Sequence, residues 1–500
     1  MVSITRDGKR VIASIPVESV DEAIAESLDA LRSGADLVEL RLDYLPEIRK
    51  TDVDLILGQV PGERCIITIR SPAEGGVRHH ENWIEILRYA MNKGAKIDVE
   101  AERGSALTDI KRSSVISRHG DITHLCMMER DIESYPGMEY KGVFEVRSLK
   151  DVSDLVAYAR CLNARGKRFF LMGSGPLGNF TRYLLPLFGS GGAYVHTGRA
   201  TAGCQPLLTE YKRVMDSIHL SEPEGIVCLL GKNIGYTLSP VMHNSALERY
   251  NIPWVYLPLD LDEDFIPLVR DCSSLPIKGF NVTTPYKEKV IMFLDSVSKE
   301  CEEIRAVNTI TIQNGKLCGY NTDAPAFRDV LMQRVHARGI ENLSELKALV
   351  IGAGGVARAA VYTLKKEGAE IYLINRSESR AERLAGEFGC KMWGGLSSGK
   401  KFIPEVDLIV NCTPVSSSDE LPIPRGSITP HHIVMDMVYQ PFRTVLLERA
   451  AEQGATVIEG IHTLAHQAAL AFKLWTDRDI TPDFMLESAM KYIMHNNSHQ

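Results

Sequence analysis

Short apolar runs recur along the first two hundred residues, separated by segments with helical periodicity. Eight runs are present: Val11–Ile15, Leu37–Leu42, Cys65–Ile69, Lys96–Val99, Val115–Ser117, Gly142–Val146, Phe169–Met172 and Ala193–His196. Between the first two, Ile24, Leu28 and Leu31 follow the period of an amphipathic helix, and Ser19 with Glu22 predicts a capping box at its start. Alternating strands and helices indicate a parallel sheet, and eight repeats favour a closed (β/α)8 TIM barrel of α/β class.

A polar break at residues 221–225 precedes a second pattern. Three further runs, Ile226–Leu230, Trp254–Leu257 and Ile277–Val282, predict strands with helices between them. Further on, the run Ala348–Ile351 leads directly into Gly352-Ala-Gly-Gly-Val-Ala357 and a helical segment. A glycine-rich turn alone is weak evidence, but a strand before it and a helix after it indicate a Rossmann dinucleotide-binding turn. We therefore expect three domains: a barrel at 1–220, a substrate-binding domain at 225–323 plus 460–500, and a dinucleotide-binding domain at 324–459.

Composition narrows the class of protein. Five hundred residues with 44% hydrophobic and 24% charged side chains exceed one core and suit two or three globular domains. A formal charge of -7 argues against nucleic acid as a partner, and no apolar run reaches the roughly 18 residues of a membrane helix. Ten cysteines without a Cys-x-x-Cys pair favour a reducing cytoplasm over disulfides or zinc, and no metal-ligating constellation is present.

Charged residues gather where the first-half strands are predicted to end. Glu39, Arg41, Arg70, Glu100 and His119 all fall at or just past such ends. In a parallel barrel these ends form one face, the face that carries active sites. Any one of these residues alone is most often a solvent-facing charge or a structural ion pair. Two arginines, two carboxylates and a histidine at one face argue strongly against that interpretation.

Over nearly all of residues 1–215, the chain resembles the type I 3-dehydroquinate dehydratases. The segments that carry the resemblance are Glu39-Leu-Arg41, Arg70-Ser-Pro-Ala-Glu74-Gly-Gly and Ser117-Arg-His119. The resemblance implies that Lys141 is a Schiff-base lysine and His119 a catalytic acid–base group oriented by Glu74. It implies substrate binding by Ser14, Glu39, Arg41, Arg70, Arg182, Thr201 and Gln205. Thr201, Gly203-Cys204 and Gly142 depart from the family pattern.

Lysine chemistry explains why such a site needs these residue types. A free lysine is almost wholly protonated at neutral pH, so we expect removal from water and the arginines nearby to favour the neutral amine of Lys141. Attack of that amine on a ketone gives an iminium, which acidifies the adjacent C–H bond. We expect His119, with a pKa near neutrality, to remove that proton and return one to the departing hydroxyl.

From residue 225 to about 495, the chain resembles the shikimate dehydrogenases. The resemblance rests on Tyr236-Thr-Leu-Ser-Pro240, His243-Asn244, Asn281-Val-Thr-Thr-Pro-Tyr-Lys287, Ala306-Val-Asn-Thr309, Asn321-Thr-Asp323, Asp436-Met-Val-Tyr439 and Gln467. It implies that Lys287 is the acid–base residue, poised by Asp323. It implies substrate binding by Thr237, Ser239, Thr283, Asn308, Tyr439 and Gln467, and cofactor contacts from Met437 and Gly460. Two departures are Pro325-Ala326, where Gly normally precedes Phe327, and His462-Thr463, where the family shows Gly-Met beside the nicotinamide.

The cofactor is predicted from the turn and from the end of the next strand, Glu370–Ile374. The turn residues Gly352, Ala353, Gly354, Gly355 and Val356 would place a pyrophosphate on a helix N-terminus, which favours an anion. Asn375, Arg376, Ser377 and Arg380 follow that strand. Their donors suit a ribose 2′-phosphate, with Glu378 secondary, so we predict NADP over NAD.

The resemblances together imply a bifunctional enzyme of the shikimate pathway, which serves aromatic amino acid biosynthesis. The first half would dehydrate 3-dehydroquinate to 3-dehydroshikimate, and the second would reduce that product to shikimate with NADPH. Two alternatives remain open: quinate dehydrogenation in the second half, or a quinate-sensing regulatory pseudoenzyme. Two of the residues also have a non-catalytic interpretation. Lys287 could be a surface lysine, and Asp323 could be the N-cap of a helix at Ala326.

Overall fold

The computed structural model describes residues 8–107, 114–415, 423–424 and 426–497, and it divides into two compact units. The first comprises Met1–Glu224 with Leu257–Pro276, and the second comprises Gly225–Tyr256 with Ile277–Gln500. The first unit holds eight parallel strands: β1 (Arg10–Pro16), β2 (Leu37–Arg41), β3 (Cys65–Thr68), β4 (Lys96–Glu100), β5 (Val115–Asp121), β6 (Glu139–Glu145), β7 (Phe169–Ser174) and β8 (Gly192–Val195). All eight predicted strands are present, and the prediction of an α/β barrel is confirmed.

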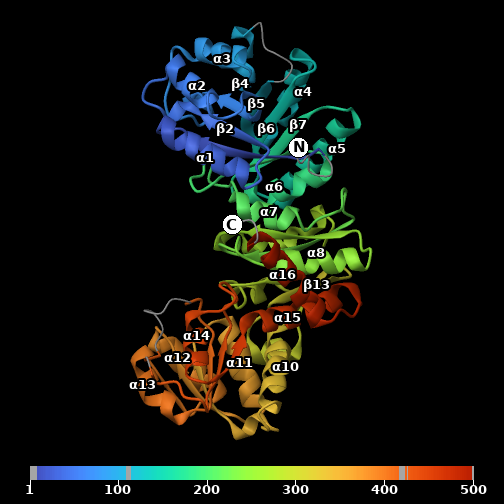
Figure 1. Ribbon diagram of the computed structural model, residues 1–500. Coiled ribbons are helices and arrows are strands. Elements are labelled where there is room, and N and C mark those ends of the chain that lie inside the picture. The colour runs from blue at the N-terminus through green and yellow to red at the C-terminus, as the bar shows by residue number, and fades with distance from the viewer. Residues whose placement is uncertain (1–7, 108–113, 416–422, 425, 498–500) are drawn as a thin grey trace. The chain divides into compact units, whose positions relative to one another are not determined.

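Helices lie outside these strands (Figure 1). They are α1 (Val20–Arg32), α2 (Lys50–Leu57), α3 (Trp83–Asn92), α4 (Leu125–Ser134), α5 (Leu149–Ala164), α6 (Gly178–Leu184) and α7 (Leu208–Met215). The connection after β4 is a short 3-10 helix, Ala101–Ala106, and residues 108–113 lie outside the described part of the chain. The predicted capping box on α1 is wrong, because Ser19 is the N-cap but its side chain accepts no capping hydrogen bond.

The barrel closes between β7 and β8 without a regular ladder. Hydrogen-bonded strand neighbours run β7-β6-β5-β4-β3-β2-β1-β8. Gly191 bridges the seam, since its N–H donates to Phe169 O (2.7 Å) and its carbonyl accepts from Arg10 N (2.8 Å). The Arg182 guanidinium adds a second bridge, from Nη1 to Gly173 O (2.8 Å) and from Nε to Tyr194 O (3.2 Å). A side-chain cation therefore completes the closure beside the backbone.

Two six-stranded sheets follow along the chain, and all of their strand residues belong to the second unit except 257–260, which are grouped with the first. The first has the order β10-β9-β11-β13-β14-β12 and is mixed; it comprises β9 (Gly225–Gly231), β10 (Trp254–Asp260), β11 (Ile277–Val282), β12 (Ser296–Val297), β13 (Thr309–Gln313) and β14 (Lys316–Tyr320). The second is parallel with the order β17-β16-β15-β18-β19-β20; it comprises β15 (Lys347–Ile351), β16 (Glu370–Ile374), β17 (Met392–Gly394), β18 (Leu408–Asn411), β19 (Ile433–Asp436) and β20 (Thr456–Glu459). The second sheet is the predicted dinucleotide-binding fold.

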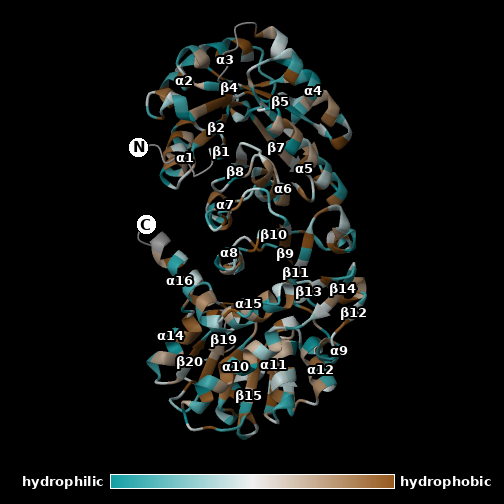
Figure 2. Cartoon of the chain, turned by 90° about the vertical axis from the view of Figure 1, so that its right-hand side faces the viewer, coloured by the Kyte–Doolittle hydropathy of each residue, from teal (hydrophilic) through white to brown (hydrophobic). Residues whose placement is uncertain are grey.

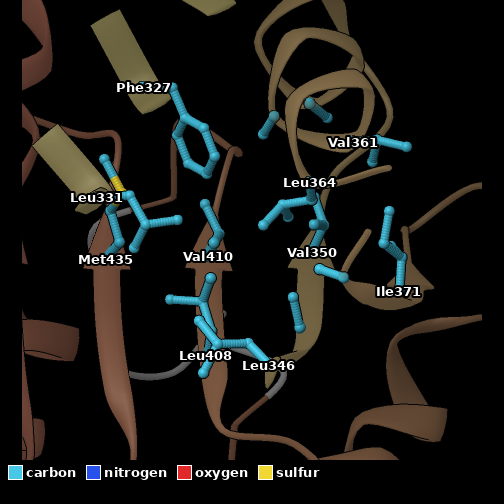
Figure 3. Close-up of a cluster of buried hydrophobic side chains, with 14 of the residues drawn as sticks. Phe327, Leu331, Leu346, Val350, Val361, Leu364, Ile371, Leu408, Val410 and Met435 are labelled. Atoms are coloured by element: carbon cyan, nitrogen blue, oxygen red, sulfur yellow. The ribbon is translucent and has the colours of Figure 1, made fainter. Parts of the chain in front are cut away.

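Its helices are α8 (Ser239–Arg249), α9 (Lys299–Ile304), α10 (Asp323–His336), α11 (Gly355–Lys366), α12 (Glu378–Phe388), α13 (Gly399–Phe402), α14 (Val445–Glu452), α15 (Gly460–Thr476) and α16 (Pro482–Asn497). One core lies between the parallel sheet and two of these helices, α10 and α11 (Figure 3). Phe327, Leu331 and Leu364 from the helices pack there against Val350 and Val410 from the strands. Strand β15 falls at the hydrophobic end of the scale in Figure 2, as a strand buried on both faces should.

Candidate active sites

Lys141 lies inside the barrel on β6, with only 6% of its side chain exposed. Its Nζ is 2.9 Å from Glu39 Oε1, 3.0 Å from Asp98 Oδ2 and 3.9 Å from the centre of the Tyr194 ring. The nearest charges are therefore carboxylates rather than the arginines expected from the sequence. The lysine Nζ is thus surrounded by two carboxylates and an aromatic face.

Both carboxylates are held ionised by the cations around them. Burial raises the pKa of Glu39, but Lys141 and the nearby arginines outweigh burial and leave that pKa below its ordinary value. Burial also raises the pKa of Asp98. Arg70, Lys141 and a hydrogen bond from Ser117 outweigh burial and bring that pKa well below its ordinary range. The site is thus a compact network of opposite charges with little contact with water.

His119 and Glu74 form the second part of the barrel site. His119 Nδ1 lies 2.8 Å from Glu74 Oε2, as the predicted orienting role of Glu74 requires. Burial, Arg70 and Lys141 lower the pKa of His119 well below 6.5, so our expectation of a pKa near neutrality is wrong and the imidazole is neutral at pH 7. Burial raises the pKa of Glu74 to about 7, with Arg70 opposing the shift. The carboxyl group of this pair, rather than the imidazole, titrates near neutrality.

The three predicted arginines take different partners. Arg41 makes two 2.8 Å bonds to Asp43, and Arg70 pairs with Asp98 at 3.0 Å and donates to Ser117 at 2.8 Å. Arg182 instead donates to backbone carbonyls, including those of the barrel seam. Carbonyls carry no net charge, and no carboxylate of the described residues pairs with Arg182, whereas Arg41 and Arg70 each have one.

The remaining predicted residues of the barrel also meet. Ser14 Oγ donates to Glu39 Oε2 (2.5 Å) and lies 2.7 Å from Thr201 Oγ1, whose backbone N–H donates to Gln205 Oε1 (2.9 Å). The predictions missed Asp98, although Ile97-Asp98-Val99-Glu100 alternates like a half-buried strand and places Asp98 on one face with Glu100.

The second site is a cavity of about 680 Å³ within the second unit. It is lined by predicted residues, namely Thr237, Ser239, Thr283, Lys287, Asn308, Asp323, Val356, Met437, Tyr439, Gly460 and Gln467, and also by Asn281, Cys412 and Thr463, which were not predicted. Lys287 Nζ lies 2.5 Å from Asp323 Oδ2, and both side chains are buried. Asn308 Nδ2 donates to Asp323 Oδ1 (2.8 Å) and to Gln467 Oε1 (3.4 Å). One hydrogen-bond network thus joins the lysine to the end of the cavity at Gln467.

The interpretation of Asp323 as an N-cap is wrong. Helix α10 begins at Asp323 itself and its N-cap is Thr322, whose side chain makes no capping bond. Both carboxylate oxygens of Asp323 are used by Asn308 and Lys287. At the other wall, Thr237 Oγ1 and Ser239 Oγ lie 3.2 Å apart at the start of α8. Short hydroxyl side chains at a helix N-terminus suit an anion such as a carboxylate.

The glycine-rich turn joins β15 to α11 as predicted. Gly352 has φ +117°, which side chains rarely adopt, and Gly354 is the N-cap of α11. Arg376 and Arg380 are exposed after β16, while Asn375 Nδ2 donates to Ser377 O (2.9 Å) and fixes the local turn. Gly352, Ala353, Gly354, Gly355 and the residues after β16 do not line the cavity, which the turn reaches through Val356. These residues form a separate edge, with the N-terminus of α11 and two exposed arginines, whose chemistry fits a dinucleotide.

Comparison with known proteins identifies both halves. Residues 11–222 match the type I 3-dehydroquinase profile, residues 229–310 match the shikimate dehydrogenase substrate-binding domain, and residues 334–428 match the shikimate/quinate 5-dehydrogenase profile. A shikimate dehydrogenase (NADP(+)) of Halothermothrix orenii is 38% identical over 283 residues, which are 54% of this chain and 96% of that protein. The chain belongs to the shikimate dehydrogenase family. It carries a type I 3-dehydroquinase domain in the same polypeptide.

Other relatives extend the comparison. A shikimate dehydrogenase (NADP(+)) of Pyrococcus abyssi is 39% identical over 52% of this chain and 94% of its own length. A Thermus thermophilus shikimate 5-dehydrogenase solved with NADP(H) and shikimate is 36% identical, with 53% of this chain and 99% of that chain covered and a TM-score of 0.48. None of the helices in the described part of this shikimate dehydrogenase family member combines the length and the apolarity needed to cross a membrane.

Proposed function

We propose that this chain catalyses two consecutive steps of the shikimate pathway. The first unit would dehydrate 3-dehydroquinate to 3-dehydroshikimate, and the second would reduce that product to shikimate with NADPH. The observation that carries the proposal is that each unit buries its own lysine against carboxylates: Lys141 against Glu39 and Asp98, and Lys287 against Asp323. Two lysines with such different surroundings suit two different reactions.

In the dehydration, Lys141 acts as the nucleophile. The Lys141 amine attacks the substrate ketone, and the carbonyl oxygen takes up the two amine protons and leaves as water as the imine forms. The imine draws electrons from the adjacent C–H bond, and neutral His119 removes that proton. The same imidazolium protonates the departing hydroxyl, which leaves as water, and hydrolysis of the imine regenerates Lys141. Glu74 holds the imidazole at 2.8 Å throughout.

Arg182 is the best candidate to bind the substrate carboxylate in the barrel. Arg41 and Arg70 already pair with Asp43 and Asp98, whereas Arg182 contacts neutral carbonyls. A guanidinium without a counter-charge gains most from an anionic ligand. Ser14, Thr201 and Gln205 form one hydrogen-bonded set and would bind polar groups of the same substrate.

In the reduction, Lys287 donates the proton. NADPH, held by the turn Gly352–Val356 and the residues after β16, would supply the hydride that reduces the ketone carbon. Lys287 protonates the resulting oxygen, and a proton then returns to Lys287 through Asp323. Protonation by a positioned acid of this kind contributes about 10²–10⁴-fold in rate. Thr237 and Ser239 bind the carboxylate, and Thr283, Asn308, Tyr439 and Gln467 bind the ring hydroxyls.

The residues present fit NADP. The turn Gly352–Val356 presents the N-terminus of α11 to a pyrophosphate, and exposed Arg376 and Arg380 with Ser377 suit a 2′-phosphate. Met437 and Gly460 would border the nicotinamide, since a Cβ at Gly460 would lie 2.7 Å from Met437 O. We also propose the domain limits 1–220, 225–323 with 460–500, and 324–459. A cytoplasmic location is supported by ten cysteines that are all free thiols.

Two experiments test the proposal. Incubation with 3-dehydroquinate and NADPH should give shikimate, with 3-dehydroshikimate accumulating when NADPH is withheld. Borohydride added with 3-dehydroquinate should fix the substrate covalently on Lys141, detectable by peptide mass analysis. Dehydration that proceeds while Lys141 stays unmodified would rule out the imine. Oxidation of quinate in preference to shikimate would instead assign the second unit to quinate.

A further inference from the structure

Thr463 carries a hydroxyl group that the protein leaves without a partner. It lies on the second turn of α15, is 3% exposed and lines the cavity of the second unit. Among the described residues, no group hydrogen-bonds its Oγ1. Other hydroxyls on helices of this chain bond a carbonyl four residues back, as Ser27 does with Ala23 O (2.6 Å) and Thr476 with Phe472 O (2.8 Å). Thr463 therefore lacks even the local bond that its position offers.

A buried hydroxyl without a partner is destabilising, so a partner from outside the chain is expected when the cavity fills. Thr311 Oγ1 and both ring nitrogens of His243 are also buried and unpartnered within the described residues, yet neither residue lines this cavity. Thr463 alone of these three is placed to meet a ligand.

The neighbours of Thr463 on α15 indicate which ligand would supply the partner. Gly460, Thr463 and Gln467 are spaced by three and four residues, so they share one face of α15 and all line the cavity. Gly460 lies against the Met437 backbone, whereas Gln467 accepts from Asn308 at 3.4 Å and through it reaches Asp323 and Lys287. Thr463 is one turn from Gln467, and Asn308 and Asp323 connect Gln467 to Lys287 by hydrogen bonds.

Gln467 has only part of its hydrogen-bonding capacity free for a ligand. Its Nε2 donates to Leu464 O at 3.0 Å, and its Oε1 accepts from Asn308. One amide N–H therefore remains for ligand hydroxyls, each of which can donate and accept. Thr463 supplies the missing donor and acceptor. The methionine that the family pattern shows here would offer only a weak sulfur acceptor.

We propose that Thr463 is a specificity-determining residue that hydrogen-bonds a ring hydroxyl of the polyhydroxylated substrate. The inference rests on the proposed reduction of 3-dehydroshikimate. It adds a donor and acceptor to the cavity wall one turn from Gln467.

The test compares Thr463→Val, which keeps the shape and deletes the hydroxyl, with Thr463→Ser, which keeps the hydroxyl. Calorimetry with shikimate and with NADP+ separately should show Val weakening shikimate roughly 2- to 12-fold, the range of a neutral hydrogen bond, with NADP+ unchanged. Ser should restore most of the loss. Thr463→Val should not lower the ligand-free melting temperature, because it removes an unsatisfied buried group.

Thr311→Val is the matched control, since its hydroxyl is equally buried and unpartnered but lies outside the cavity lining. It should leave shikimate affinity unchanged. Unaltered shikimate affinity in Thr463→Val, or an equal loss of NADP+ affinity, would overturn the inference while leaving the proposed reaction intact. A wild-type protein that binds NADP+ but neither shikimate nor 3-dehydroshikimate would contradict the proposed function itself.

Discussion

Gly355 leaves the space that Lys287 occupies. A Cβ at Gly355 would lie 2.9 Å from Lys287 Cβ and 3.0 Å from Lys287 Cδ. Gly355 is the first residue of α11, in the predicted dinucleotide turn, so the backbone of that turn bounds the stem of the predicted acid–base lysine. The two predicted functions, phosphate binding and proton donation, depend on the same contact.

We expect Gly355→Ala to displace Lys287 from Asp323 and to lower kcat for reduction about 100-fold, the cost typical of a 1 Å misplacement. Steady-state kinetics with 3-dehydroshikimate would measure the loss, and fluorescence titration with NADPH would separate it from cofactor binding. Gly386→Ala is the control, because a Cβ there meets nothing within 4 Å. A Gly355→Ala enzyme with normal kcat would show that the turn does not position the lysine.

Dehydration should increase with pH through the titration of Glu74. Below its pKa of about 7 the carboxyl is protonated; above it, the carboxylate accepts the Nδ1 proton of His119 and frees Nε2 to act as a base. His119, whose pKa is lowered, stays neutral across this range. We expect kcat at pH 6 to be about one-tenth of its plateau, and Glu74→Gln to lack this rise. A flat profile from pH 6 to 8.5 in the unmodified enzyme would contradict the assignment.

The same shift makes stability depend on pH in the opposite sense. The folded state binds the Glu74 proton more tightly than the unfolded state, in which the pKa is near 4.5. Its contribution to the free energy of unfolding is therefore fully present below pH 4.5 and is lost as the pH rises to about 7. Thermal unfolding of Glu74→Gln, compared with the unmodified protein across this range, would isolate that contribution.

Asp98→Asn should destabilise the first unit strongly. The carboxylate is fully buried between Arg70 and Lys141, so its loss leaves two cations without their shared partner, at about 3–5 kcal/mol. Calorimetric unfolding would show the drop. Glu47→Gln removes an exposed partner of Arg49 and should leave the melting temperature unchanged. Equal effects of the two changes would mean that the buried network adds little.

Arg376→Ala should weaken NADPH and barely change NADH. A charge-assisted pair to the 2′-phosphate is worth about 1.5–3 kcal/mol, or roughly 10- to 150-fold in affinity. The residue is exposed, so the substitution should leave the fold intact. Titration with both cofactors measures the ratio. Equal losses for NADPH and NADH would assign Arg376 a structural role.

The two sites should be chemically independent. Every predicted dehydratase residue lies in the first unit, and every predicted dehydrogenase residue lies in the second. Lys287→Ala should abolish reduction and leave dehydration within a few-fold of normal. Lys141→Ala should do the reverse when 3-dehydroshikimate is supplied. Loss of both activities from either change in a folded protein would refute the two-site proposal.

The sequence predicted strands better than it predicted contacts. Buried parallel strands are apolar on both faces, so runs such as Phe169–Met172 stand out, and each barrel strand was found within a few residues. The hairpin of β13 and β14 was missed although Asn314-Gly315, both with positive φ, is a strong turn signal between alternating strands.

Site residues were predictable where a motif fixes them and less so where packing decides. Lys141 meets His119 and Glu74 in one network, but its immediate neighbours are carboxylates because Asp43 and Asp98 neutralise Arg41 and Arg70. Arg41 and Asp43 are only two residues apart, but Arg70 follows β3 whereas Asp98 lies on β4, so no local pattern encodes the second pairing. The lowered pKa of His119 has the same origin, in burial and in cations distant in sequence.

Arg182 ties the barrel seam and the predicted carboxylate site to one guanidinium. A change at this position would be selected against twice, once for weaker turnover and once for an opened seam. Selection for activity alone would thus preserve closure, even in a lineage under no pressure for stability. Sequence drift at this position should accordingly be slower than at the most buried apolar positions, which can exchange with one another.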